Sequence, residues 1–222
     1  MINSGATQIR KQLETEMNNN KFLLASARAV SAIFHPLLIP TLGFLFLFSS
    51  GFYFSILPWA LKKYILLVVF ITTCFLPALS IFILSINSKF DINMEKNTDR
   101  TLALIISAIS YYIGYLLLKR VPSFPVYSIM LIGSVLVQVV LLPISMRWKI
   151  SVHLAAIGGL IGGFLSLAFR LQENPVFLLS SLIIVAGMIG TARLILSKHT
   201  EYQIYAGFTT GFLILFLILS FI

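Results

Sequence analysis

Three short stretches of the chain hold residues that could bind and transfer a phosphate group. One contains Arg100, the second contains His153, and the third contains Arg193 and His199. Arginine offers planar, bidentate donors to phosphate oxygens, whereas histidine can act near neutral pH as a nucleophile or as a proton donor. These residue types predict a site in which arginine holds a phosphoryl group and histidine attacks it or protonates its leaving group.

The composition places these residues in a membrane protein. Of 222 residues, 59% are hydrophobic and only 10% are charged, against about 25% charged in soluble domains, and the mean hydropathy is +0.98. At about 20 apolar residues per crossing, the chain has room for six or seven helices and for no separate catalytic domain. We therefore predict an all-α, polytopic membrane helix bundle with any chemistry at helix ends or inside the bundle.

Apolar runs bounded by charge, proline or asparagine predict about seven transmembrane helices. We place them near 33–56, 64–86, 101–118, 124–145, 151–169, 176–196 and 202–222. Residues 1–30 form a polar, amphipathic N-terminal segment, of which residues 1–21 lack the apolar core that a cleavable signal peptide needs. Residues 31–222 then form a single transmembrane domain.

The order of the predicted spans brings the candidate residues to one face. The connections after the second, fourth and sixth spans must share a side of the membrane, and the candidate residues lie in or beside these connections. The fifth and seventh helices also begin there, so their free N–H groups and positive dipole ends favour a bound anion. Glycines four residues apart, at 158 and 162 and at 207 and 211, predict close packing of the fifth and seventh helices and bring the sixth helix with them.

Charge and cysteine content narrow the function further. The net charge is +9, from 16 Lys and Arg against 7 Asp and Glu. No basic helix lies outside the apolar spans, which argues against nucleic-acid binding. The single Cys74 lies within an apolar run, which excludes a disulfide or a cysteine-based metal site.

The candidate residues resemble, in order and spacing, the signature of the type 2 phosphatidic acid phosphatase superfamily of integral membrane lipid phosphatases. Its third motif is Ser-Arg-x5-His-x3-Asp, of which Arg193 and His199 match, while Ala192 replaces the serine and Gln203 replaces the aspartate. The resemblance covers roughly residues 91–207 and places a phosphatase-like core at about 87–222.

The first two motifs match in part. In the second, Pro-Ser-Gly-His, the residues Ser151 and His153 match. In the first, Lys-x6-Arg-Pro, only Arg100 matches, because Asn93 stands in place of the lysine and Thr101 in place of the proline.

The resemblance implies a phosphohistidine mechanism on a lipid phosphate, without a metal or other cofactor. His199 attacks phosphorus and His153 protonates the leaving oxygen. Arg100 and Arg193 hold the phosphoryl oxygens, and Ser151 with its backbone N–H adds donors. It also implies a phosphorylated membrane lipid as the partner and a bacterial inner membrane as the location.

Two departures from the motifs bear on this mechanism. Gln203 could orient His199 through its amide oxygen but brings no negative charge, which predicts weaker activation of the nucleophile. The missing lysine removes one cation, although Lys96, Lys149 or Lys198 could reach the same oxygens.

Each candidate also has a structural interpretation. Arg193 could extend from a helix end to the lipid headgroups. Thr200 and Gln203 fit a capping box, which would leave His199 as the residue before a helix cap. His35 matches no motif, and we interpret it as structural or peripheral.

Two functions therefore remain open. The first is a lipid phosphatase; the second is a non-catalytic protein of the same fold that binds anionic lipids or serves as a partner subunit. A transporter is less favoured, because no acidic residue lies in the middle of a span. The side of the membrane on which the site lies also remains open. Eleven of the 16 Lys and Arg fall on the site face, and an excess of positive charge is typical of the cytoplasmic side. Cations that bind phosphate do not report orientation, however, and the bacterial enzymes that the chain resembles act on the periplasmic side.

Overall fold

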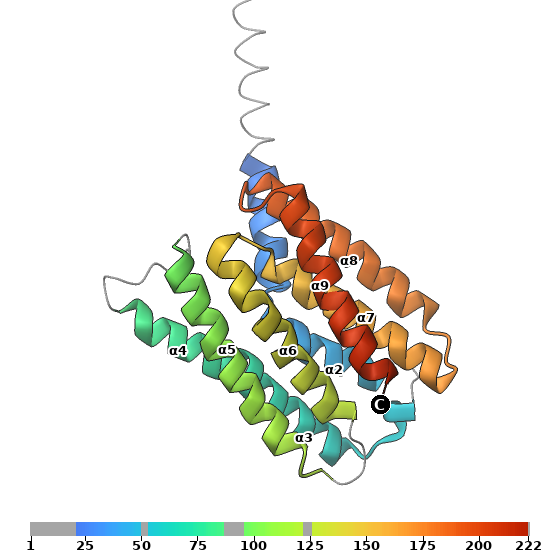
Figure 1. The fold of residues 1–222 in the computed structure, drawn as a ribbon. Coiled ribbons are helices and arrows are strands. Elements are labelled where there is room, and N and C mark those ends of the chain that lie inside the picture. Colours follow the sequence, from blue (N-terminus) through green and yellow to red (C-terminus); the bar gives the residue numbers. More distant parts are fainter. Residues whose placement is uncertain (1–20, 50–52, 87–95, 122–125, 222) are drawn as a thin grey trace, which may run out of the picture.

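The computed structural model describes residues 21–49, 53–86, 96–121 and 126–221, and within these ranges all regular secondary structure is helical. Among the described residues, six helical segments are long and apolar enough to cross a membrane: Trp59–Ser85, Asn97–Leu118 (α5), Val126–Arg147 (α6), Val152–Leu171 (α7), Val176–Ile195 (α8) and Glu201–Ser220 (α9). Trp59–Ser85 joins α3 (Trp59–Phe70), a π-helical turn (Ile71–Phe75) and α4 (Leu76–Ser85). The prediction of an all-α, polytopic bundle is confirmed (Figure 1).

The first predicted span is not one helix. A helix covers residues 21–33, the chain leaves helical geometry over residues 34–38, and α2 occupies Ile39–Ser49, followed by a 3₁₀ turn at Tyr53–Ile56. Pro36 accounts for the break, because proline lacks a backbone N–H and disfavours the helical conformation in the residue before it. The 11 residues of α2 reach about 16 Å, short of the roughly 30 Å hydrocarbon core, so the prediction of a single helix over 33–56 was wrong.

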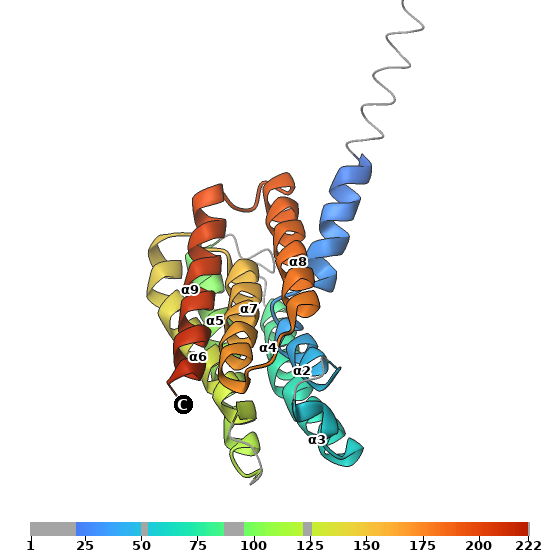
Figure 2. The ribbon, with the colours of Figure 1, turned by 90° about the vertical axis from the view of Figure 1, so that its right-hand side faces the viewer.

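Helix α7 lies between α8 and α9 (Figure 2). Its backbone meets that of α9 directly, since a Cβ atom added at Gly158 or Gly162 would collide with the carbonyl oxygen of Phe208 or Phe212. A Cβ atom at Gly211 would likewise collide with the carbonyl oxygen of Ala155. The close packing that the glycine spacing predicts is therefore confirmed for α7 and α9.

Helices α5 and α6 form a second, antiparallel pair. The Arg100 side chain at the start of α5 donates to the carbonyl oxygen of Ser145 near the end of α6. Further along the pair, a Cβ atom added at Gly114 would lie 3.1 Å from the side chain of Leu131. Arg100 therefore lies opposite Ser145, and Gly114, 14 residues later, lies opposite Leu131, 14 residues earlier. The residues between them pair in the same order along more than three helical turns.

Hydrogen bonds join the helix ends at one face of the bundle. Asn97 at the start of α5 donates through its side chain to the carbonyl oxygen of Met146 in α6, at 2.9 Å. The N–H of Ser151, which caps α7, donates to the carbonyl oxygen of Gln203 in the first turn of α9, at 3.2 Å. These bonds join the start of α5 to the end of α6 and the start of α7 to the start of α9.

Candidate functional site

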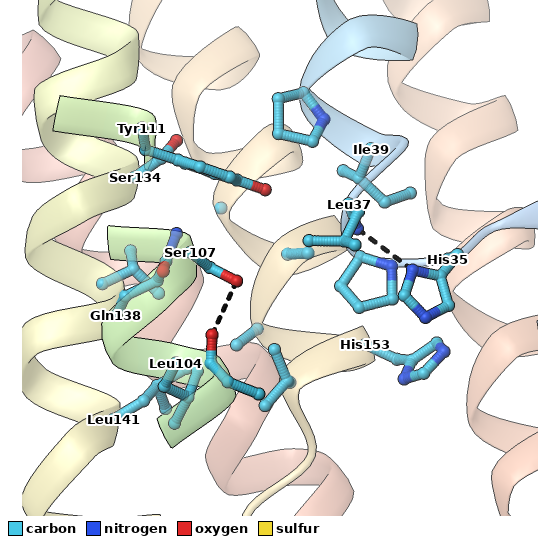
Figure 3. A pocket seen from close by; sticks show the side chains of 18 of the residues that line it. His35, Leu37, Ile39, Leu104, Ser107, Tyr111, Ser134, Gln138, Leu141 and His153 are labelled. Atoms are coloured by element: carbon cyan, nitrogen blue, oxygen red, sulfur yellow. Dashed lines mark hydrogen bonds between the residues drawn. The ribbon is translucent and has the colours of Figure 1, made fainter. Parts of the chain in front are cut away.

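A cavity of about 360 Å³ is lined by residues from this face and from the interior of the bundle. Its polar end holds two arginines, two lysines and three histidines: Arg100, Arg193, Lys149, Lys198, His35, His153 and His199. No Asp or Glu is among the described residues that line it. The rest of the wall is mostly apolar and includes Phe44, Leu104, Met130, Leu160 and Leu215. Figure 3 shows part of this wall, with Leu104 and Leu141 on one side of the cavity and His35 and His153 on the other.

Arg100 is held in place by its own helix and by α6. One Nη atom donates to the Asn97 side-chain oxygen at 2.7 Å and to the Ser145 carbonyl oxygen at 3.0 Å. Its Nε is buried and has no hydrogen-bond partner within the described part of the chain. A fixed guanidinium with a spare donor is suited to an anion; Asn93, the other residue compared with the first motif, lies outside the described residues.

Arg193 lies in the last turn of α8, and its Nε is also buried without a partner among the described residues. Beyond it the helix ends in a tight turn. The N–H of Ser197 donates to the Leu194 carbonyl oxygen at 2.8 Å, and the N–H of Lys198 to the Arg193 carbonyl oxygen at 3.1 Å, with Ser197 in the left-handed conformation at φ 50°. This paired C-terminal cap reverses the chain and brings His199 to the same cavity as Arg193.

The His199 ring is held through its Nδ1 atom. Nδ1 lies 3.0 Å from the carbonyl oxygen of Lys149 and 3.3 Å from the side-chain oxygen of Gln203. Because a carbonyl oxygen can only accept, Nδ1 carries the hydrogen, and Nε2 is left with a free lone pair. Burial, with the charge of Arg193, lowers the pKa of His199 to about 4 although both hydrogen bonds oppose this, so the ring is neutral at pH 7.

Gln203 has two roles at the start of α9. Its side-chain oxygen accepts the N–H of Thr200 at 3.1 Å and completes a capping box with the Thr200 side chain. The capping box that the sequence predicts is confirmed, and the same oxygen lies next to His199. The structural and the orienting interpretations of Gln203 are therefore compatible.

His153 lies in the first turn of α7 and contacts a histidine that the sequence analysis set aside. The rings of His35 and His153 pack edge to face, with centroids 5.5 Å apart (Figure 3). His35 stands in the break between the helix of residues 21–33 and α2, and its Nδ1 accepts the N–H of Leu37 at 3.4 Å. The sequence analysis interpreted His35 as structural or peripheral; its place in the cavity wall rules out a peripheral position and leaves the structural interpretation open. The sequence signal for this place was Pro36, because proline ends helical geometry next to His35.

Three of the predicted site residues lie outside the cavity wall: Ser151, Lys96 and Gln203, the last of which reaches the site only through its contact with His199. The Ser151 side chain is fully buried, and its backbone N–H donates to the carbonyl oxygen of Gln203. Lys96 is exposed where α5 begins. Of the three lysines considered as substitutes for the missing motif lysine, Lys149 and Lys198 line the cavity.

Comparison of the chain with protein-family models, curated proteins and solved structures gave no match. The class of protein follows from the fold alone. The six apolar helices make it a polytopic, α-helical integral membrane protein, and the bundle carries a cationic cavity at one end.

Proposed function

We propose that the protein is an integral membrane phosphatase that hydrolyses a lipid phosphate monoester or diphosphate through a phosphohistidine intermediate. One observation carries the proposal. His153, His199, Arg100 and Arg193 come from different helix ends, and all four line a single cavity. The partial resemblance to type 2 phosphatidic acid phosphatases implies the same roles for these residues.

The shape and charge of the cavity favour an amphiphilic substrate. Two arginines and two lysines at the polar end offer positive charge to a phosphate, and the lining residues supply no carboxylate to repel it. Each arginine also has a buried Nε donor without a partner in the described structure, which a phosphoryl oxygen would satisfy. The apolar wall beyond is suited to a hydrocarbon chain.

In the proposed reaction, Nε2 of His199 attacks phosphorus and forms a P–N bond while the bond from phosphorus to the lipid oxygen breaks. His153 donates a proton to that leaving oxygen, which departs as an alcohol, or as a lipid phosphate from a diphosphate. His153 then takes a proton from a water molecule that attacks phosphorus, the P–N bond breaks, and inorganic phosphate leaves. Arg100 and Arg193 neutralise the non-bridging oxygens throughout.

The acceptor for His199 Nδ1–H differs from that in the family motif. The motif places an aspartate there, whereas this chain offers the Lys149 carbonyl oxygen and the Gln203 amide oxygen. Both fix the ring, but neither carries the negative charge that would stabilise the developing imidazolium. We therefore expect a slower phosphatase than one with a complete motif.

The same absence of charge favours a second candidate function. Without a carboxylate on Nδ1, the cavity could bind an anionic lipid and hold it without turnover, as a binding protein or partner subunit. For either function, the resemblance to bacterial lipid phosphatases points to a bacterial inner membrane as the location.

Phosphate release from phosphatidate and from a prenyl diphosphate by purified protein tests the proposal. We expect release by the unchanged chain and loss of release in His199→Ala. Arg147→Ala, which removes an exposed cation at the end of α6, should retain release and is the matched control. Equal release by the unchanged chain and His199→Ala would overturn the phosphatase, and Arg193-dependent binding without release would establish the second candidate.

A further inference from the structure

The apolar wall of the cavity contains a second group of polar side chains, well away from the arginines. Ser107 and Tyr111 come from α5, and Ser134 and Gln138 come from α6 (Figure 3). We call these four residues the inner polar band. All four lie in the middle of predicted spans, at a depth where polar side chains are costly and commonly functional.

The register of α5 and α6 places the band in two levels. Arg100 contacts Ser145, so Ser107, seven residues further along α5, lies level with Gln138 on the antiparallel α6, and Tyr111 lies level with Ser134. At 1.5 Å per residue, the first level is about 10 Å from Arg100 along the helix axis and the second about 16 Å. Figure 3 shows all four side chains on the part of the cavity wall that α5 and α6 form.

The two serine hydroxyls of the band donate to backbone carbonyl oxygens and can still accept hydrogen bonds. The hydroxyls of Ser107 and Ser134 donate to the carbonyl oxygens of Ala103 and Met130, each at 2.8 Å. Their lone pairs remain as acceptors.

Gln138 extends this pattern. Its side chain is 7% exposed, and its oxygen has no hydrogen-bond partner within the described residues. A buried amide oxygen favours a hydrogen-bond donor, so a donor group on a ligand that reaches Gln138 would be bound there in preference to a hydrocarbon chain.

We propose that the inner polar band binds a hydrogen-bond donor on the lipid, a hydroxyl or an amide N–H about 10 Å from the phosphorus atom. This inference rests on the proposed function, since it takes the phosphate to lie at the arginines. The preferred ligand is then a lipid phosphate with a polar group part-way along its chain, and a plain alkyl phosphate is a poorer one.

A set of alkyl phosphates tests this inference on the full-length protein in a non-ionic detergent. The probes are dodecyl phosphate and three of its hydroxylated forms, with the hydroxyl beside the phosphate, about 10 Å from phosphorus, or at the chain end. Calorimetry should show the second form binding about three- to tenfold more tightly than dodecyl phosphate, the ratio expected for one net hydrogen bond. The other two forms should show no such gain.

Two variants locate the effect. Gln138→Met, of similar size and without the amide, should bind dodecyl phosphate as tightly as the unchanged chain does. It should lose the added affinity for the probe whose hydroxyl lies about 10 Å from phosphorus. Val139→Met, on the half-exposed outer side of the same turn, is the matched control. It should keep the affinity for dodecyl phosphate and the added affinity for the hydroxylated probe.

The comparison of hydroxylated forms on the unchanged chain needs no variant and decides the inference even if Gln138→Met fails to fold. Equal affinities for all four probes would mean that water alone satisfies the band, and would overturn the inference while leaving the proposed function intact. If dodecyl phosphate binds equally to the unchanged chain and to Arg193→Leu, the phosphate site itself is wrong and the inference falls with it.

Discussion

The Nδ1 atom of His199 lies 3.0 Å from the backbone carbonyl oxygen of Lys149. The two residues come from different connections, the one between α8 and α9 and the one between α6 and α7. Because the acceptor is a backbone atom, it stays in place whatever side chain residue 149 carries. This contact orients the ring and leaves Nε2 as its nucleophilic atom.

The first prediction concerns the protonation of His199. Burial and Arg193 hold its pKa near 4, so the ring should stay neutral, with hydrogen on Nδ1, from pH 8 to below pH 6. Histidine ¹⁵N NMR, with the signal assigned by its loss in His199→Gln, measures this directly. An imidazolium signal for His199 at pH 6 would contradict the burial of the ring beside Arg193, and a neutral ring with its hydrogen on Nε2 would contradict the hydrogen bond from Nδ1 to the Lys149 carbonyl oxygen.

The same pKa predicts how His199 affects stability. The unfolded ring has a pKa near 6.5, so between pH 6.5 and about 4 the unfolded chain binds more protons than the folded one. The contribution of neutral His199 is therefore fully present above pH 6.5 and is lost as the pH falls toward 4. His199→Gln should reduce the acid sensitivity of the unfolding midpoint in this range, and an unchanged pH dependence would contradict the burial of the ring.

Arg193 should dominate the affinity for phosphate. Removing a charged hydrogen-bonding group from a buried contact costs about 1.5–3 kcal/mol, so Arg193→Leu should weaken the binding of dodecyl phosphate by roughly 10- to 100-fold. Arg147→Leu, on the same face but outside the cavity wall, should change the affinity by less than about twofold. Similar losses in both variants would mean that general surface charge attracts the ligand.

The contact between α7 and α9 should be intolerant of added volume. Gly211→Ala would drive a methyl group into the Ala155 carbonyl oxygen and should destabilise the protein by about 1–3 kcal/mol. Gly187→Ala in α8 meets no atom within 4 Å and should be neutral or stabilising, since alanine favours helix over glycine. Thermal unfolding in detergent compares the two, and equal midpoints would contradict the close backbone packing.

Ser197 should tolerate glycine better than a branched residue. Its φ of 50° is strained for a residue with a Cβ atom and most strained for a β-branched one. Ser197→Val should lower stability by about 1–2 kcal/mol and disturb the turn that leads to His199, whereas Ser197→Gly should fold at least as well. A valine variant as stable as the glycine variant would argue against the paired cap.

The sequence predicts the bundle well because long apolar runs have few stable alternatives in lipid. The starts of α7 and α9, near Val152 and Glu201, follow from the residues before them. The break at His35 is different: Pro36 signals it, but the apolar residues on both sides resemble a continuous span.

The site is predictable in part for a similar reason. Arg100, His153 and His199 converge because alternating helices must return to the same face. The acceptor for His199 could not be foreseen, since the Lys149 carbonyl carries no side-chain signal. The inner polar band was also missed, because Gln138 becomes meaningful only when the register of α5 against α6 places it beside Ser107.

The central claim is that His199 becomes phosphorylated during turnover, and mapping the phosphorylated residue tests it most directly. The purified protein would be mixed with a radiolabelled lipid phosphate, quenched in alkali, which preserves phosphohistidine, and digested for mass spectrometry. We predict one phosphorylated peptide, carrying the phosphate on His199 and absent from His199→Asn. Turnover without a phosphorylated histidine, phosphate on another residue, or no covalent phosphate with any lipid phosphate would contradict the account.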